Sequence, residues 1–418
     1  MRIGFLQTTD ANSEYESGVT RYGRLLAQQG KKRGELDIQV VEVKLTAPDA
    51  DACQLKEAGH KLSTCNVVHG QFSKYLWGGG WQQWQRLRQF LQSLAVPLVV
   101  TMHDIDTVLY SPAQLGQMVW QENQRQRSYA KSPSLALRST LRQLWQQRLP
   151  DSITLLHLVQ QSDRVLVCTQ EEAQHLQYIC GRNWHNSADI VYSSSRAHGI
   201  SKLQVIPHFV EEPVLRLSPQ AAKDQLGLNH RQIVTLQGFI SRGKGHRLAI
   251  EALAQLPDTV MLIFAGMATS ENQAFLQELR QLAADLGVTS QLLITGYLDD
   301  ETLARYLWAS DLALCPFSKM AASGSLSTWI ALGRPILASQ WPQIEAYNQL
   351  EPGAIRVFTP YTATALAKAI NAQLQDSEAV SAVHQDQALA RLRGRLHIAQ
   401  IFEEHLTIYK SVMALEDI

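Results

Sequence analysis

The sequence predicts an α/β protein made of two Rossmann-like domains, whose parallel sheets face a cleft between them. Short apolar segments of strand length alternate with amphipathic helical patterns, which is typical of a parallel sheet covered by helices on both faces. The same alternation begins again after about residue 210, and the length of 418 residues agrees with two or three domains of ordinary size. Ligands of such sheets bind beyond the carboxyl ends of the strands.

The first half contains six apolar segments that we interpret as buried strands. Gly18 opens an amphipathic helix after the first of them, and residues 81–94 form another helical pattern before the fourth. These strand–loop–helix units predict a domain over residues 1–210. The predicted strands cover residues 1–7, 38–43, 67–69, 98–102, 163–168 and 203–206.

The second half repeats the pattern and predicts a domain over residues 211–395, with the boundary near residues 207–213. Gly333 is the expected C-cap of a helix that ends near Leu332. Residues 392–415 read as helical, and we expect residues 396–418 to pack back on the first domain. The predicted strands cover residues 233–237, 260–265, 292–295, 312–315 and 335–338, and the helices residues 246–256, 272–286 and 302–309.

Composition excludes several classes of protein. Apolar residues make up 45% of the chain, too many for a disordered protein. Thirty-eight basic residues balance 38 acidic ones, whereas a general nucleic-acid binder would carry a basic surplus. The five cysteines show no metal-binding spacing, which indicates reduced thiols in a cytoplasmic protein. No apolar run has the length of a membrane span, and we expect no signal peptide.

The loop of residues 238–245 is the first candidate site. It joins a predicted strand to a helix, and Gly238, Gly243 and Gly245 let backbone N–H groups approach a ligand. Lys244 and Arg242 add positive charge suited to a diphosphate. The loop lacks the Walker A pattern. The alternative is a glycine-rich turn whose basic residues are only solvated.

Three further segments combine small or polar residues with a strand end or a helix start. Ser323, Gly324 and Ser325 precede a helix that contains Thr328, and they offer N–H donors to an anion or simply cap the helix. Gly18 lies at an equivalent junction. His103 follows a predicted strand, where it contacts a sugar hydroxyl, acts as a base or has a structural role.

Two local patterns bear on metals and membranes. Residues 104–106 spell Asp-Ile-Asp, a pattern that binds a metal–nucleotide complex in some enzymes, but three-residue patterns are common by chance and we expect no metal. Residues 121–150 are basic and interleaved with apolar side chains, with Glu122 as the single acid before Pro150. Such a segment either lies on an anionic membrane surface or forms a solvated helix face.

A series of blocks resembles GT-B glycosyltransferases, in particular glycosyltransferase family 4. Their order and spacing carry the resemblance, which covers most of the chain. In the first half the blocks are residues 101–104, 162–165 and 205–208. In the second half they are residues 238–245, 249–252, 264–266, 293–296, 297–303, 309–312, 323–325 and 331–336.

The resemblance implies transfer of a hexosyl group from a nucleotide-diphosphate sugar to a hydroxyl acceptor, with retention and without a metal or other cofactor. Lys244 with Arg242 would stabilise the leaving diphosphate, and His103 would line the reaction centre. Tyr297 would lie near the base. The donor-binding set would be Gly18, Gly238, Phe239, Arg242, Lys244, Gly266, Tyr297, Ser323, Gly324, Ser325 and Thr328. The acceptor residues are not indicated. A glycan or lipid-linked acceptor at the inner face of the plasma membrane, in bacterial polysaccharide synthesis, is the expected setting.

The chain departs from the family pattern at two places. The family often has two Glu residues eight positions apart, where this chain has Met320 and Thr328, and an Arg where it has Phe239. The missing Glu pair leaves an alternative open, a catalytically degenerate GT-B protein that binds a nucleotide sugar as a partner or sensor. An epimerase or a phosphorylase on the same fold is a third possibility, distinguished by its products.

Overall fold

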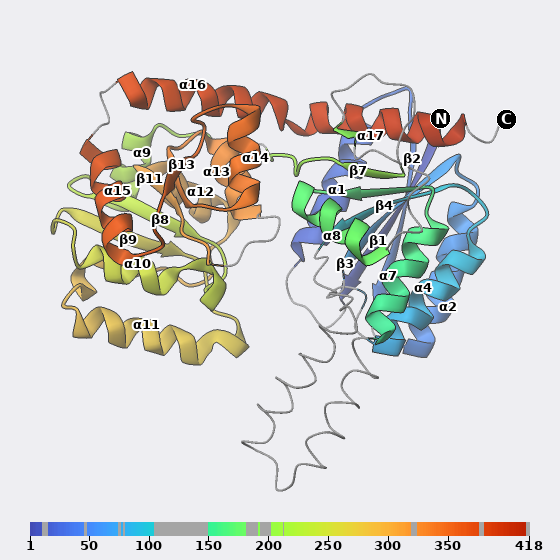
Figure 1. Cartoon of the computed structure of the whole chain (residues 1–418), viewed down its shortest axis with the longest axis horizontal. Helices are drawn as coiled ribbons and strands as arrows, with labels where there is room; N and C mark the ends of the chain where they lie inside the picture. Colours follow the sequence, from blue (N-terminus) through green and yellow to red (C-terminus); the bar gives the residue numbers. More distant parts are fainter. Residues whose placement is uncertain are drawn as a thin grey trace, which may run out of the picture. The chain divides into compact units, whose positions relative to one another are not determined.

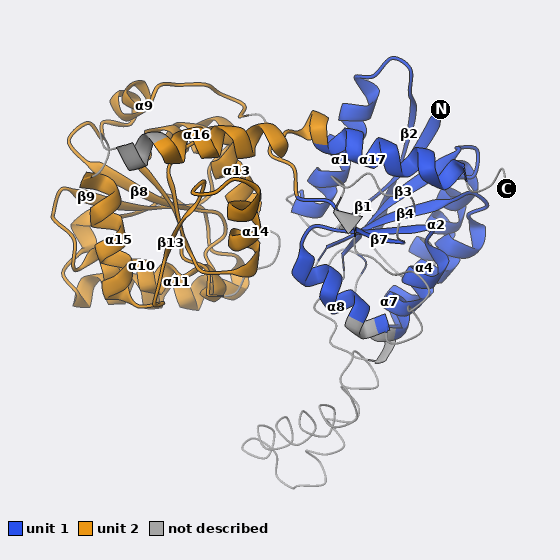
Figure 2. Cartoon of the chain, turned by 45° about the horizontal axis from the view of Figure 1, so that its top comes forward, with its two compact units in different colours: residues 1–207, 401–418 blue, residues 208–400 orange. Residues whose placement is uncertain are grey.

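A computed structural model of the chain shows two α/β units, and this confirms the predicted fold class (Figures 1 and 2). Unit 1 comprises Met1–Pro207 with Ile401–Ile418, and unit 2 comprises His208–Gln400. The sequence predicts domain boundaries between residues 210 and 211 and between residues 395 and 396. The structure describes residues 1–10, 16–45, 48–73, 77, 80–103, 149–180, 191–192, 202–211, 213–318, 324–375 and 380–414.

The sheet of unit 1 is parallel throughout its described strands, in the order β2-β1-β3-β4-β5-β7-β6. Its central strand β3 is completely buried, as expected for a sheet covered on both faces. The sequence does not predict β6, because two residues carry no period. The strands are β1 (Arg2–Asp10), β2 (Asp37–Leu45), β3 (Val67–Ser73), β4 (Leu98–His103), β5 (Arg164–Val167), β6 (Val191–Tyr192) and β7 (Leu203–Val205).

Helices cover both faces of this sheet, and the two faces differ in chemistry. One face is apolar: Leu6, Val68 and Val100 pack with side chains of α2, α4, α7 and α8 in one core cluster. On the other face lie α1 and the C-terminal helix α17, where His69 contacts Tyr409. The helices are α1 (Gly18–Lys31), α2 (Pro48–Leu62), α4 (Gly80–Ser93), α7 (Leu149–Gln161), α8 (Gln170–Cys180) and α17 (Ile398–Met413).

The sheet of unit 2 has the doubly wound order β10-β9-β8-β11-β12-β13 and is also parallel. The strand order reverses between β8 and β11, which is where such sheets bind ligands. All strands predicted for this half are present, and β13 adds a short edge. The strands are β8 (Gln232–Gln237), β9 (Val260–Ala265), β10 (Leu292–Ile294), β11 (Leu312–Cys315), β12 (Ile336–Ser339) and β13 (Arg356–Phe358).

Two core clusters fill the faces of the second sheet. Side chains of α10, α11 and α15 form one cluster, and those of α9 and α12 pack into the other. Gly333 follows α13 with φ +67°, which confirms the predicted C-cap. The helices are α9 (Pro219–Leu226), α10 (His246–Leu253), α11 (Gln273–Asp285), α12 (Asp300–Ala309), α13 (Gly324–Leu332), α14 (Pro342–Leu350), α15 (Ala363–Gln375) and α16 (Val380–Arg395).

The final helical stretch is two helices rather than one. The carbonyl of Leu396 accepts a hydrogen bond from Val210 N–H at 2.8 Å, and Val210 forms a parallel bridge with His397. This pairing takes the backbone at residues 396–397 out of the helical pattern, so α16 ends at Arg395 and α17 begins at Ile398. Within the part of the chain that the structure describes, no helix combines the length and apolar character that a membrane crossing requires.

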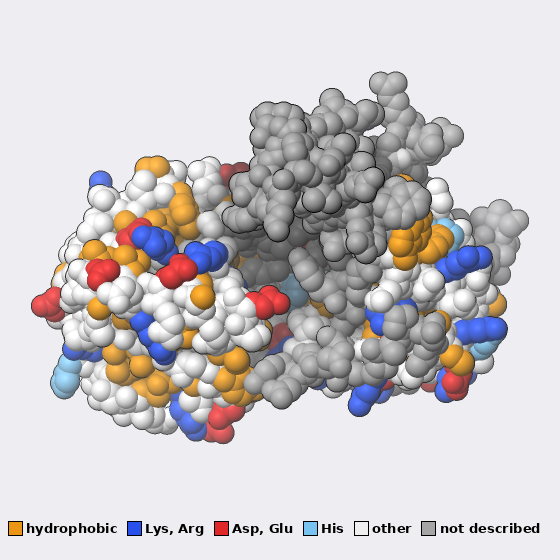
Figure 3. Space-filling model, turned by 90° about the horizontal axis from the view of Figure 1, so that it is seen from below, with side chains coloured by type: hydrophobic (Ala, Val, Ile, Leu, Met, Phe, Trp, Pro, Cys, Tyr) orange, Lys and Arg blue, Asp and Glu red, His pale blue; other side chains and the backbone are white. Residues whose placement is uncertain are grey.

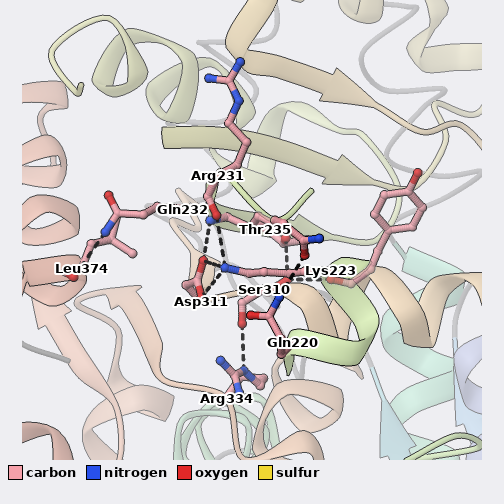
Figure 4. Close-up of polar contacts among 12 residues, drawn as sticks. Gln220, Lys223, Arg231, Gln232, Thr235, Ser310, Asp311, Arg334 and Leu374 are labelled. Atoms are coloured by element: carbon pink, nitrogen blue, oxygen red, sulfur yellow. Dashed lines mark hydrogen bonds and ion pairs between the residues drawn. The ribbon is translucent and has the colours of Figure 1, made fainter. Parts of the chain in front are cut away.

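A half-buried ion pair ties together the amino ends of β8 and β11 (Figure 4). Lys223 of α9 donates to both carboxylate oxygens of Asp311 at 2.8 and 2.7 Å, and Ile233 N–H donates to the same carboxylate at 2.7 Å. Nearby, Ser310 donates to Thr235 at 2.6 Å. These bonds fix the two strands that flank the reversal of strand order, at the sheet edge opposite their carboxyl ends.

Replacing Asp311 tests the importance of this pair. Asp311→Asn leaves the Lys223 ammonium, 12% exposed, without its carboxylate, which costs about 2 kcal/mol of unfolding free energy. Urea unfolding measures the loss. The matched control is Glu301→Gln, which removes an ion pair with Arg305 on the surface of α12, where the expected change is about 0.5 kcal/mol or less. Equal losses in both variants would contradict a special role for Asp311.

Candidate functional site

Glycines mark the carboxyl edge of the second sheet, directly after β8, β9 and β10. Gly238 N–H donates to Ala265 C=O at 3.0 Å, and a Cβ added at Gly266 would overlap the carbonyl oxygen of Gly238. The loops that follow β8 and β9 therefore lie in backbone contact. Gly296 follows β10 with φ +74°. This edge leaves backbone groups open to approach.

A second close approach joins the loops that follow β8 and β11, the two strands at the reversal point. Gly245 has φ +78°, and a Cβ there would overlap the carbonyl oxygen of Pro316. Ser318 N–H donates to Gly243 C=O at 2.9 Å. The short 3-10 helix Arg242–Lys244 is thereby held against the loop after β11, and α10 begins directly after it.

Lys244 is the central side chain of this edge. Its Nζ lies so close to Gly238 that a Cβ at that position would overlap it. Burial lowers the pKa of Lys244 from its usual 10.5. The neighbouring Cys315 supplies little negative charge to stabilise the ammonium, because burial raises the pKa of that thiol to about 12. Among the described residues no carboxylate forms an ion pair with Lys244. A half-buried ammonium with a lowered pKa favours an anionic ligand.

His246 supports the loop and was not predicted from the sequence. Its ring lies edge-on to Phe264 at 4.7 Å, and its Nδ1 lies 3.2 Å from the carbonyl oxygen of Ser241. Burial and the Lys244 charge lower the pKa of His246 to about 3, so the ring is neutral and Nδ1–H donates to Ser241. The pairing of a buried ring with the loop carbonyl leaves no signal in a single sequence.

Arg242 does not join Lys244 in the structure. Its guanidinium donates to Glu278 of α11 at 2.6 Å and lies 4.6 Å above the ring of Phe275. The ion pair is exposed, with 66% of the Arg242 side chain accessible, and such pairs contribute about 0–1 kcal/mol. The phosphate-binding role predicted for Arg242 therefore requires that it leave Glu278, and Lys244 is the cation already in place.

The remaining predicted residues of unit 2 follow strand ends or begin α13. Phe239 and Tyr297 follow Gly238 and Gly296, and their side chains are 50% and 61% exposed. Gly324 and Ser325 open α13, while Thr328 donates its hydroxyl to Gly324 C=O at 3.0 Å within that helix. The aromatic side chains therefore lie at the same sheet edge as Lys244.

In unit 1 the predicted residues lie at the carboxyl edge of the first sheet. His103 ends β4, is 7% exposed, and its Nε2 lies 2.8 Å from Gln71 Oε1. Its ring lies edge-on to Tyr22 of α1 at 5.1 Å. Gly18 is the first residue of α1, whose N-cap Ser17 accepts a hydrogen bond from Thr20 N–H. His103 thus has a fixed orientation, while nothing surrounds Gly18 within 4 Å of an added Cβ.

Some predicted features lie outside the described residues. These are Ser323, Met320, the Asp104–Asp106 pattern and residues 121–148 of the basic segment. In the ranges that the structure does describe, no group of three or more His, Cys, Asp or Glu could hold a metal ion. On the face shown in Figure 3, basic and acidic side chains of described residues are interspersed.

Comparison with known proteins shows what the two units resemble. Residues 230–376 match the family model described as "Glycosyl transferases group 1". HepE of Anabaena, solved with UDP and glucose, is 17% identical with a TM-score of 0.66, over 98% of this chain and 100% of that chain. No curated protein matches the chain.

Two more solved structures have the same extent of similarity. A glycosyltransferase from Rickettsia africae is 15% identical with a TM-score of 0.66, over 99% of each chain. Sucrose-phosphate synthase from Thermosynechococcus elongatus is 17% identical with a TM-score of 0.65, also over 99% of each chain. The chain has the GT-B fold, and residues 230–376 of unit 2 match the group 1 glycosyltransferase model.

The close approach at Gly245 generates a test of the site. Gly245→Ala places a Cβ on the Pro316 carbonyl and separates the loops after β8 and β11, so it moves Lys244. Gly287→Ala is the control, because Gly287 has a similar φ of +73° with nothing within 4 Å of its Cβ. Calorimetry with inorganic pyrophosphate, an anion suited to the Lys244 charge, should show binding lost in Gly245→Ala and retained in Gly287→Ala. Equal affinity in both variants would contradict this arrangement.

Proposed function

We propose that the chain transfers a sugar from a nucleotide-diphosphate donor to a hydroxyl acceptor, and that unit 2 binds the donor diphosphate at Lys244. The observation that carries the proposal is the half-buried Lys244 ammonium beside Gly238, at the point where the strand order reverses. A diphosphate supplies the negative charge that this cation lacks among the described residues. Glycine at positions 238 and 266 leaves room for the phosphate oxygens beside the backbone.

The proposed chemistry follows from the charge that develops on the leaving group. As the bond from the sugar to the diphosphate breaks, negative charge grows on the β-phosphate, and Lys244 stabilises it. N–H groups at the start of α13 and near Gly18 add to this stabilisation. Tyr297, exposed after β10, offers a ring face to the base, and His103 contacts the donor sugar. Retention of configuration without a metal is part of this proposal.

The setting of the reaction is also a proposal. Structures of HepE contain UDP, UDP-glucose, or UDP and glucose, which supports a uridine nucleotide as the donor. We propose a glycan or lipid-linked acceptor in polysaccharide synthesis, in the cytoplasm at the inner membrane face. The basic residues 121–150 motivate the membrane contact.

A second candidate function is binding of a nucleotide sugar without transfer. Thr328 stands where relatives often have Glu, and its hydroxyl is bonded to its own helix at Gly324. No carboxylate at this position can hold the hydroxyls of a donor sugar. A protein with Lys244 intact and this anchor missing would bind the nucleotide yet release no diphosphate.

A panel of nucleotide sugars separates the two functions. We expect wild-type protein to release a nucleoside diphosphate from at least one donor in the presence of a glycan acceptor. Lys244→Met should reduce this turnover by about 100-fold or more, because the leaving group loses its cation. Lys368→Met, which removes an exposed lysine of α15, is the control and should turn over normally. Tight binding of UDP without any release would favour the second candidate.

The pH dependence of UDP binding tests the state of Lys244. Its pKa is lowered by burial, so the ammonium loses its proton at a lower pH than an ordinary lysine, and the affinity should fall as the pH rises through that value. Lys244→Arg remains charged over this range, so its loss of affinity should begin at a higher pH. The uracil ring titrates equally in both experiments. Identical alkaline profiles would show that Lys244 does not bind the diphosphate.

A further inference from the structure

A buried group of polar side chains lies on one face of the first sheet, and the proposed chemistry does not use it. His69 and Gln71 are two residues apart in β3, so their side chains share this face of the sheet. In the pairing of β3 with β4, Gln71 lies beside Thr101 and Ser73 lies beside His103. His69, Gln71 and Thr101 are at most 4% exposed. Buried polar groups need partners, and these side chains form a continuous series of hydrogen bonds.

The chain of hydrogen bonds runs from the C-terminal helix α17 to His103. Tyr409 Oη lies 2.6 Å from His69 Nδ1, and Thr101 Oγ1 lies 2.8 Å from His69 Nε2. Gln71 Nε2 lies 3.3 Å from the same His69 Nε2. Gln71 Oε1 lies 2.8 Å from His103 Nε2. His69 and Tyr409, which are 340 positions apart in the sequence, are thus bonded directly, and His69 and Gln71 together link Tyr409 to His103.

The donor and the acceptor of each hydrogen bond in this series can be assigned. An amide nitrogen can only donate, so His69 Nε2 must be the unprotonated nitrogen, and its one lone pair is shared between the Gln71 amide and the closer Thr101 hydroxyl. Burial lowers the pKa of His69 well below its usual 6.5, so the ring is neutral and its single proton is on Nδ1, which donates to Tyr409. At the other end Gln71 Oε1 accepts, and His103 Nε2 must carry the proton.

We propose that Tyr409, His69 and Gln71 are positioning residues that fix His103 as the Nε2–H tautomer. The inference rests on the proposed function, in which His103 contacts the donor sugar. In this tautomer Nδ1 is the acceptor nitrogen of the His103 ring, and the ring cannot donate a hydrogen bond from it. Helix α17 thereby contributes to the reaction centre without touching the substrate.

Packing around these hydrogen-bonded side chains keeps each donor and acceptor in its place. A Cβ added at Gly23 of α1 would lie 2.8 Å from Gln71 Cγ, so α1 holds the amide in place. Burial raises the pKa of Tyr409 well above its usual value and lowers that of the adjacent His405 to about 4. With His69 neutral as well, these three rings keep their protons unchanged around neutral pH.

A double-mutant experiment on the full chain tests the proposal. Tyr409→Phe keeps the ring and removes the hydroxyl, and Gln71→Met keeps the approximate shape and removes the amide. Each should lower kcat by about tenfold, the effect of one misdirected hydrogen bond, with the KM for the donor unchanged. Because Tyr409 and Gln71 act through the same series of hydrogen bonds, the double variant should turn over no more slowly than Gln71→Met. The control is Ser411→Ala, which removes a hydroxyl bonded to Ile408 C=O inside the same helix.

Nitrogen NMR of the His103 ring provides a readout that does not depend on turnover. Wild-type protein should show the Nε2–H tautomer, and Gln71→Met should show a mixture. A wild-type Nδ1–H tautomer, additive losses of kcat, or a change confined to melting temperature would overturn the inference. If wild-type protein transfers no sugar while the tautomer shifts as expected in the variants, the proposed function fails and the positioning chain stands.

Discussion

The candidate site depends on the placement of one half-buried ammonium group. Lys244 occupies the space beside Gly238 because that residue has no side chain, and the backbone contacts at Gly245 and Gly266 keep the surrounding loops from moving apart. Burial makes the charge costly in the free protein. The Lys223–Asp311 pair holds the opposite end of the same strands.

Much of the fold could be predicted from the sequence, because strand and helix periods are local properties. Apolar runs located the long strands, whereas β6 and β13 were too short to carry a pattern. The prediction of a single helix at the end of the chain was wrong for a tertiary reason, because Val210 pairs with residues 396–397. That pairing joins positions far apart in the chain, and no local propensity records it.

The site could be predicted only in part, for the same reason. Glycine spacing located the loop and Lys244, since backbone approach requires residues without a side chain. The pairing of Arg242 with Glu278 could not be predicted, because that partner lies 36 residues away on α11. Nor could the sequence show that His69 and Tyr409 share a hydrogen bond. Such partners are set by how helices pack, and a single sequence does not encode them in readable form.

The return of α17 to unit 1 has a consequence for how the chain is made. A ribosome releases unit 1 first, at about 5–20 residues per second, yet helix α17 follows all of unit 2. Until α17 is made, the sheet face that bears His69 and Gln71 lacks that helix, and water must replace the Tyr409 hydroxyl as the partner of His69. The first unit synthesised is therefore the last to be completed. A chain interrupted before residue 398 would retain the family-matched segment at residues 230–376 but carry an unfinished first unit.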